Sequence, residues 1–259
     1  MTKEQLLEST DAFLFDLDGT VYLDETPIGD VKGTLARLRA LKKRVVFVTN
    51  NSSKTEEEYR KKLSRIGILG EGDLIYTSAM AAAEHVFAHF PKKRVHLLAT
   101  DAVKEEFART VPLVEDEPDV VILAYDTSLT FAKLKRFNEF LAGGAYFIAT
   151  HPDAVCPTKG VPMPDVGSFL ELFYVSSGRR PDLVVGKPNT VMGESLERRL
   201  HIPRIRMCMV GDRLHTDIRF GNNCSMHTVL VLSGETTEET RKNYPDEPTL
   251  VLPDVNALL

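Results

Sequence analysis

The sequence lacks several features that would point to particular classes of protein. Its 259 residues include only three cysteines and no C-x-x-C pair, which predicts neither a disulfide framework nor a zinc cluster and favours a reducing compartment. No apolar run approaches the roughly 18 residues that span a bilayer, and the polar N-terminus has no signal-peptide apolar region. The net charge of -5 disfavours a general surface for nucleic acid or anionic membranes. We therefore expect a cytoplasmic protein with no nucleic-acid or membrane partner.

Common catalytic signatures are missing as well. There is no G-x-G-x-x-G, no G-x-S-x-G and no H-E-x-x-H. The stretch "VVGKPN" is not a Walker A loop, because Pro188 stands where that loop needs Ser or Thr. The stretch "DLDGT" is not an EF-hand loop, because the position that needs glycine holds Val21. Dinucleotide binding, serine hydrolysis and zinc proteolysis are thus not indicated.

What the sequence does have is an alternation of strand and helix patterns. Several short runs, such as "RVVFV" and "DVVILA", are continuously apolar, as parallel strands covered on both faces are. The predicted strands cover residues 12–16, 44–48, 94–99, 119–124, 145–149, 182–185, 206–210 and 227–232. Helical patterns cover residues 30–42, 54–65 and 189–200. This order predicts an α/β fold with a mostly parallel, doubly wound sheet.

Polar residues of unusual kinds follow four of the predicted strands. Ligands of doubly wound folds bind at the carboxyl ends of the strands, and the four strand ends read "DLDGT", "TNNSS", "GKPN" and "GDRLHTD". The strands between residues 94 and 149 carry less of this chemistry. We therefore expect a core domain built from residues 1–76 and 182–259, with a second α/β unit, residues 77–181, inserted into it.

The two acids in "DLDGT" need an explanation, since they follow the apolar strand directly. Two charges there repel each other and resist desolvation, and a divalent cation between them would remove the repulsion. Asp16, at the strand tip, is held as a carboxylate nucleophile should be. Asp18 could turn back to the same site, since Gly19 relaxes the backbone. The triplet alone also leaves open a metal motif of the sugar-nucleotide type.

The second strand end offers hydrogen-bond donors. Thr49, Asn50 and Asn51 supply a hydroxyl and two amides, and Ser53 with Glu56 has the spacing of a capping box that starts a helix. Donors at a helix N-terminus can seat a phosphate. Taken alone, this stretch is more typical of ordinary capping and turn chemistry.

The last two strand ends supply a cation and two more acids. Lys187 follows a predicted buried strand and could neutralise a transferring phosphoryl group, although most lysines are simply solvated. Asp212 with Asp16 would supply the few carboxylates that Mg²⁺ prefers. Asp217 is better placed to orient those ligands. Capping of a helix by Asp212 is the structural alternative.

Taken in chain order, these motifs resemble those of a known family. "DLDGT", "TNN", "GKP" and "GDRLHTD" are similar to the four motifs of the haloacid dehalogenase-like (HAD) superfamily. The fuller strings "FDLDGTVYLDE", "VFVTNNSSKT" and "VGDRLHTDI" resemble its p-nitrophenylphosphatase or NagD-like branch. The resemblance covers essentially the whole chain. It implies a Rossmann-like core and an inserted C2-type α/β cap that folds over the active site. It also implies that the protein is a phosphatase, monomeric or homodimeric, which acts on a small phosphorylated metabolite.

The resemblance also implies roles for individual residues. Asp16 would be the nucleophile that forms an aspartyl-phosphate, and Asp18 would protonate the leaving oxygen and then activate water. Mg²⁺ would be held by Asp16, the backbone carbonyl of Asp18, and Asp212. The residues that it places around the phosphoryl group are Leu17, Thr49, Asn50 and Lys187, the last as a catalytic charge stabiliser, with Asn51 and Asp217 in support.

Three stretches depart from the family pattern. The chain reads "ATHPD" with His151 where many relatives read "ATNPD", "PDVGS" where they often read "GAGS", and "GNNCSM" where they usually read "GxxAG". The first two fall in or near the expected cap, so they bear on substrate choice and leave the chemistry untouched.

Two alternatives to hydrolysis remain at this stage. The same aspartyl-phosphate could be passed to another acceptor, as in a phosphomutase or phosphotransferase, if a closed cap excluded water. A catalytically silent metabolite-binding regulator is a further alternative, which the full set of catalytic side chains disfavours.

Overall fold

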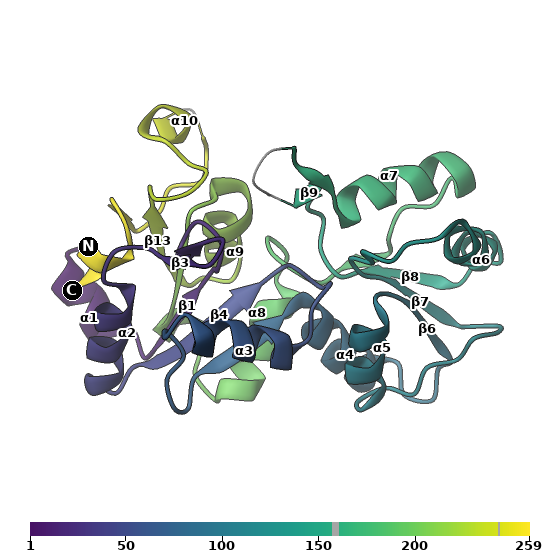
Figure 1. Ribbon diagram of the computed structural model, residues 1–259, viewed down its shortest axis with the longest axis horizontal. Coiled ribbons are helices and arrows are strands. Elements are labelled where there is room, and N and C mark those ends of the chain that lie inside the picture. The colour runs from purple at the N-terminus through teal and green to yellow at the C-terminus, as the bar shows by residue number, and fades with distance from the viewer. Residues whose placement is uncertain (157–160, 243) are drawn as a thin grey trace. The chain divides into compact units, whose positions relative to one another are not determined.

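The computed structural model describes residues 1–156, 161–242 and 244–259, which form two compact units (Figure 1). The first unit comprises Met1–Thr49, Glu56–Tyr76 and Lys187–Leu259, and the second comprises Asn50–Thr55 and Thr77–Gly186. Each unit contains a mostly parallel sheet with helices around it, so the chain has the expected α/β fold. Among the helices in the described ranges, none combines the length and the apolar character needed to cross a membrane.

A six-stranded sheet in the order β14-β13-β12-β1-β4-β5 forms the centre of the first unit. Its strands are β1 (Ala12–Phe15), β4 (Arg44–Thr49), β5 (Leu74–Thr77), β12 (Met207–Gly211), β13 (His227–Val231) and β14 (Leu250–Leu252). Strand β1 lies between β12 and β4 and is parallel to both, with Phe15 level with Val210 and Phe47. The three strands therefore reach the same edge of the sheet together.

Helices cover the sheet of the first unit on both faces, which explains the continuously apolar strands. Alternate strand residues such as Phe13, Phe15 and Phe47 join one buried cluster with Leu35 of α2 and Leu63 of α3. Leu230 of β13, which points to the other face, packs with Ile218 of η2 instead. The helical elements of this unit are α1 (Lys3–Ser9), α2 (Val31–Ala40), α3 (Glu56–Arg65), α8 (Val191–Leu200), η1 (Arg204–Arg206), η2 (Leu214–Ile218), α9 (Arg219–Asn223), α10 (Glu238–Lys242) and η3 (Val255–Leu258). A small hairpin, β2 (Tyr22–Leu23) with β3 (Thr26–Pro27), follows β1 closely in the chain.

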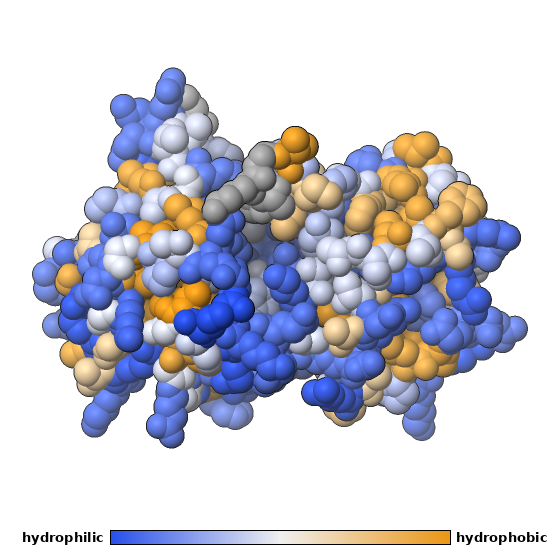
Figure 2. Space-filling model, in the orientation of Figure 1, coloured by the Kyte–Doolittle hydropathy of each residue, from blue (hydrophilic) through white to orange (hydrophobic). Residues whose placement is uncertain are grey.

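The second unit has its own four-stranded sheet, in the order β11-β8-β7-β6. Its strands are β6 (Val95–Leu98), β7 (Val120–Leu123), β8 (Tyr146–Ala149) and β11 (Leu183–Val184). In addition, β9 (Val155–Cys156) pairs in antiparallel fashion with β10 (Met163–Pro164). Its helices are α4 (Ser78–His89), α5 (Asp101–Ala108), α6 (Phe131–Ala142) and α7 (Val166–Ser177). Phe137 of α6 and Phe173 of α7 pack with Phe147 of β8. Apolar residues also show on the outside of α7 (Figure 2), where Val175 is 84% exposed.

The units differ from the predicted domains at two short segments. Residues 182–185 were expected to form a core strand, but β11 pairs with β8 in the sheet of the second unit. Residues 50–55 also belong to the second unit, and Thr100 Oγ1 there donates to the carbonyl oxygen of Ser53. A strand of two residues carries too little pattern to reveal which sheet it will join.

Candidate active site

The predicted nucleophile, phosphate-binding threonine and metal ligand come together at one edge of the first unit's sheet. Asp16 directly follows β1, Thr49 ends β4, and Asp212 directly follows β12. Because β1 is paired in parallel register with both neighbours, these three positions lie side by side. Thr49 is buried, with 6% of its surface exposed. The carboxyl edge of the sheet therefore gathers polar side chains, as doubly wound folds commonly do.

Lys187 is an ammonium group held between two carboxylates. Its Nζ lies 2.6 Å from Oδ1 of Asp16 and 2.7 Å from Oδ1 of Asp217, and its third neighbour is the carbonyl oxygen of Val48 at 3.4 Å. The lysine side chain is 1% exposed. Burial alone would lower the pKa of Lys187, but the charges of Asp16 and Asp217 raise it above its usual range. The lysine is therefore a fixed, buried cation.

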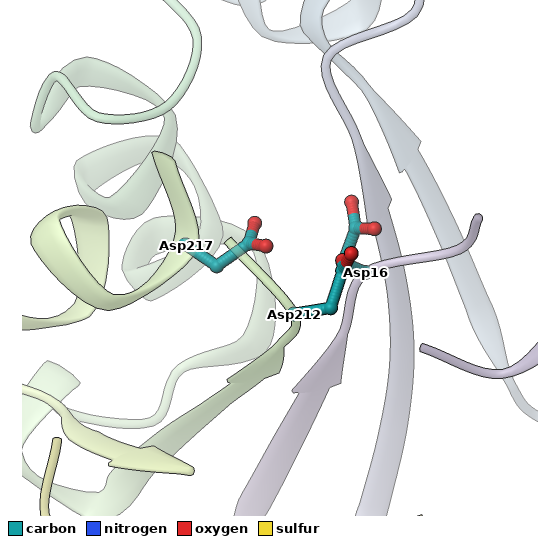
Figure 3. A group of neighbouring side chains, drawn as sticks. All are labelled: Asp16, Asp212 and Asp217. Atoms are coloured by element: carbon teal, nitrogen blue, oxygen red, sulfur yellow. The ribbon is translucent and has the colours of Figure 1, made fainter. Parts of the chain in front are cut away.

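Three carboxylates cluster around this cation. Asp16, Asp212 and Asp217 each offer an oxygen, and these oxygens lie within 4.8 Å of one another. Figure 3 shows Asp16 and Asp212 at the ends of their strands and Asp217 pointing toward them. Burial raises the pKa of Asp16, although Lys187 counteracts it. Burial and the charge of Asp217 raise the pKa of Asp212 to about 6. More negative charge is thus concentrated here than one lysine neutralises.

The surroundings of Asp212 fit a hard divalent cation. Thr20 Oγ1 donates to Oδ1 of Asp212 at 3.3 Å, and the backbone N–H of Glu235 donates to Oδ2 at 2.7 Å. A Cβ on Gly234 would lie 2.0 Å from Oδ2, and one on Gly19 would lie 2.5 Å from it. Two glycines thus leave a cradle that the carboxylate fills. Fixed carboxylate oxygens with excess negative charge are the donor set that Mg²⁺ prefers.

Adding a methyl group to this cradle should displace the carboxylate. We expect Gly234→Ala to lower the free energy of unfolding by about 1–3 kcal/mol, the usual cost of an overpacked site, and to reduce catalytic activity. Chemical denaturation and a rate assay measure the two effects. Gly143→Ala is the control, because a Cβ there meets only backbone oxygens at 3.4 Å. If both variants lost the same stability and activity, close packing of Gly234 against Asp212 would not be what holds the carboxylate in place.

Asp18 contacts a buried tyrosine. Tyr22 donates its hydroxyl to Oδ2 of Asp18 at 3.3 Å, and Lys62 Nζ lies 3.7 Å from the centre of the tyrosine ring. Burial and the neighbouring Asp18 raise the pKa of Tyr22, which keeps the phenol protonated as a donor. The carboxyl group of Asp18 is thereby oriented. The side chain of Leu17, between the two acids, is buried in the core at 1% exposure.

Asn50 and Asn51 belong to the second unit, where both amides have local partners. Asn50 Nδ2 donates to Oδ2 of Asp153 at 3.1 Å, and that same oxygen lies 3.7 Å from Nδ1 of the fully buried His151. Asn51 Oδ1 accepts from the backbone N–H and the hydroxyl of Ser53 at 3.0 and 2.7 Å. Asn51 thus performs the turn chemistry that its sequence also indicated.

One charged residue near the carboxylates was not singled out from the sequence. The backbone N–H of Arg213 donates to Oδ2 of Asp217 at 3.2 Å, and its side chain pairs with Glu235 at 3.0 Å. Burial alone would lower the pKa of Arg213, but the charges of Asp16 and Glu235 raise the pKa above its usual range. The sequence could have indicated this residue, because it directly follows Asp212 in "GDRLHTD". Arg213 is a second cation beside the acidic cluster.

Family models match two parts of the chain. Residues 13–110 match a model described as haloacid dehalogenase-like hydrolase, and residues 184–258 match one described as HAD-hydrolase-like. Together these segments include the three clustered carboxylates, Lys187, Asp18 and Thr49.

Individual relatives match over most of their length. Phosphoglycolate phosphatase 2 of Arabidopsis thaliana is 35% identical, over 99% of this chain and 95% of the relative. The 4-nitrophenylphosphatase of Thermotoga maritima, known from a crystal structure, is 38% identical in sequence to this chain. The two structures superpose with a TM-score of 0.93, over 98% of this chain and 97% of the relative. A glycerol phosphate phosphatase of Mycobacterium tuberculosis, solved in complex with magnesium and also with calcium, is 28% identical with a TM-score of 0.89, over 98% of this chain. The present chain covers 78% of the magnesium-bound relative and 76% of the calcium-bound one.

A further solved structure, described as a putative NagD protein, is 38% identical to this chain with a TM-score of 0.90, over 96% and 97% of the two chains. The chain belongs to the haloacid dehalogenase-like hydrolases, in the branch of 4-nitrophenylphosphatases and NagD-like proteins.

Proposed function

We propose that the chain is a Mg²⁺-dependent phosphatase that hydrolyses small phosphomonoesters through a phosphate ester of Asp16. The observation that carries the proposal is the position of Lys187, whose Nζ joins Asp16 and Asp217 at the carboxyl edge of the sheet beside Asp212. Relatives named as phosphatases support the reaction class. We further propose p-nitrophenyl phosphate as a substrate in vitro, and a sugar phosphate, nucleotide or similar metabolite as the natural one.

In the first step, a carboxylate oxygen of Asp16 attacks phosphorus. The side chain of Asp16 is 16% exposed, whereas that of Lys187 is 1% exposed, so the nucleophile is reachable while its cation is not. The new bond joins phosphorus to the Asp16 oxygen, and the bond from phosphorus to the alcohol oxygen breaks. Asp18 gives its proton to that oxygen as it leaves. Lys187 stabilises the charge shared by carboxylate and phosphoryl group.

In the second step, water replaces Asp16 on phosphorus. Asp18, now a carboxylate, takes a proton from the water as its oxygen attacks. Inorganic phosphate leaves and Asp16 returns to its starting form, so the protons balance over the two steps. The hydrogen bond from Tyr22 keeps the Asp18 carboxyl group in one orientation for both transfers.

The remaining proposed contacts concern the phosphoryl oxygens and the metal. We propose that the hydroxyl of Thr49 and the amide of Asn50 bind phosphoryl oxygens, and that Leu17 does so through its backbone, because its side chain is buried. Asp16, Asp212 and the backbone carbonyl of Asp18 would hold Mg²⁺, with Asp217 in support. When bound, the ion would neutralise the charge of carboxylate and phosphate and so favour their approach.

Removal of divalent metal should abolish the activity. We expect hydrolysis of p-nitrophenyl phosphate to stop after treatment with EDTA and to return on addition of Mg²⁺ in excess. We also expect Mg²⁺ to raise the melting temperature of the wild type, because a cation relieves the repulsion among the acids, and to raise that of Asp212→Asn much less. Full activity in the chelated protein would overturn the metal proposal. A comparison of kcat/KM over phosphoglycolate, glycerol phosphate, sugar phosphates and nucleoside monophosphates identifies the substrate class.

A further inference from the structure

The second unit contains a cavity of about 450 Å³ on its surface, which the proposed chemistry does not use. Its volume lies within the range of small-molecule pockets. One wall comes from the end of α4 and the loop after it, and the other from the loop after α5. The lining residues are Val86, Phe87, Phe90, Pro91, Lys92, Lys93, Arg94, Thr110, Val111, Pro112 and Val114.

Both walls are held in place by the unit's own backbone. The N–H of Phe90 donates to the carbonyl of Val86 at 2.9 Å, and the N–H of Lys93 donates to the carbonyl of Phe90 at 3.2 Å. The N–H of Val114 donates to the carbonyl of Val95 at 2.8 Å, which joins the second wall to β6. The cavity is therefore preformed, and a ligand would not have to order it.

The apolar part of the lining includes an aromatic ring that faces solvent. Phe87 is 67% exposed, although it lies on a helix whose neighbouring residue Val86 is 1% exposed. Phe90 is fixed nearby, with its ring centre 5.0 Å from that of Tyr146. An exposed ring next to a fixed ring and a hollow offers two apolar faces to a flat ligand.

The charged part of the lining is entirely basic. Lys92, Lys93 and Arg94 line the cavity, and no acid does so among the described residues. Arg94 is already paired with Glu117 and Asp119, at 3.0 and 3.4 Å. Within the described parts of the chain, neither lysine has a carboxylate within ion-pair distance, although the charge of Lys93 helps to lower the pKa of Asp119. The rim therefore carries two lysine charges without a direct ion pair to any residue that the structure describes, and Lys92 is the one farther from the acids that Arg94 binds.

Ordinary helix chemistry explains only part of this arrangement. Cations just after the C-terminal end of α4 favour the helix dipole, and that effect would hold Lys92 and Lys93 there without any cavity. It gives no reason for the exposed ring of Phe87 or for the apolar hollow beside it. The combination of apolar lining, exposed ring and basic rim matches an anion that carries a flat apolar body.

We propose that this cavity is a second ligand site, which binds a small aromatic anion such as an aromatic carboxylate, sulfonate or phosphate. The aromatic body lies against Phe87 and Phe90, and the anionic group lies at Lys92 and Lys93. The site lies wholly within the second unit and shares no residue with the proposed catalytic cluster.

Two fluorescent probes of the same shape test the proposal on the full chain. The first is 8-anilino-1-naphthalenesulfonate, and the second is N-phenyl-1-naphthylamine, which has the same rings without the sulfonate. We expect saturable binding of the sulfonate, unchanged by saturating inorganic phosphate. Lys92→Glu combined with Lys93→Glu should weaken sulfonate binding by about tenfold or more, and should change binding of the neutral probe much less.

Two further variants make the result decisive. Phe87→Gln, at an exposed helical position, should weaken both probes severalfold without unfolding the protein. Lys32→Glu combined with Lys42→Glu reverses the same charge at two exposed lysines of the first unit and should leave both probes unaffected. The proposal is overturned if the sulfonate does not saturate, if phosphate displaces it, or if the control double variant weakens it as much as the double variant at the rim.

Discussion

Asp16→Asn is expected to abolish phosphatase activity, with kcat for p-nitrophenyl phosphate reduced by about 10⁴-fold or more. An amide oxygen is a poor nucleophile, so the first displacement cannot occur. The fold should survive, because Asn has the shape of Asp and its Oδ1 can still accept the hydrogen bond that Lys187 donates at 2.6 Å. The variant also removes one of three clustered carboxylates, which offsets part of the lost ion pair.

The stability measurement separates catalysis from folding in this variant. Denaturation should place Asp16→Asn within about 1–2 kcal/mol of the wild type in the absence of metal. Asp30→Asn is the matched control, because that carboxylate is exposed and caps α2, a role that Asn also performs. Normal turnover by Asp16→Asn, measured with Mg²⁺ present, would rule out the covalent mechanism. Loss of activity with an intact fold would support it.

The strands that carry the site were predictable because their sequences are continuously apolar. The predicted runs 12–16, 44–48 and 206–210 correspond to β1, β4 and β12 within one residue at each end. All four residues of β1 are unexposed, so the run of apolar letters has a direct physical cause. Burial on both faces leaves no polar alternation that could suggest another structure.

Short elements were not predictable in the same way. The hairpin of β2 and β3 has two residues in each strand, and β11 likewise has two. Their pairing depends on what lies beside them in the folded chain, which a two-residue pattern does not encode. For this reason β11 was expected in the core sheet. Strand β5, which has four residues, was not predicted either, so its short length is not the explanation there. The motif "GKP" directly after β11 was recognised nevertheless, because its residue types are unusual after any strand.

The sequence indicated the members of the candidate site but not their contacts. Lys187 is 171 residues from Asp16 and 30 residues from Asp217, yet its Nζ bonds to both. Parallel pairing of β1 and β12 implied that Asp16 and Asp212 would be neighbours, since such strands end at one edge. The burial of Lys187, the cradle around Asp212 and the hydrogen bond from Tyr22 to Asp18 depend on side-chain packing, which the residue types alone do not fix.

Removal of the buried cation is expected to have the largest effect on stability. Lys187→Met keeps the length of the side chain but leaves Asp16 and Asp217 without their shared partner. We expect the free energy of unfolding of the metal-free protein to fall by about 3–5 kcal/mol, the range for breaking a buried ion pair from one side, and activity to fall by at least about 10²-fold. Lys61→Met, at a side chain that is 74% exposed, should change stability by less than about 0.5 kcal/mol.

A double variant tests whether the orphaned carboxylates cause that loss. If they do, Lys187→Met combined with Asp217→Asn should be more stable than Lys187→Met alone by about 1–3 kcal/mol, because one of the two uncompensated charges is gone. Activity should not return with stability, since the phosphoryl group still lacks its cation. Mg²⁺ should also raise the melting temperature of Lys187→Met, because the ion supplies positive charge to the same acids. If the double variant were no more stable than the single one, charge balance would not be what holds Lys187 in the core.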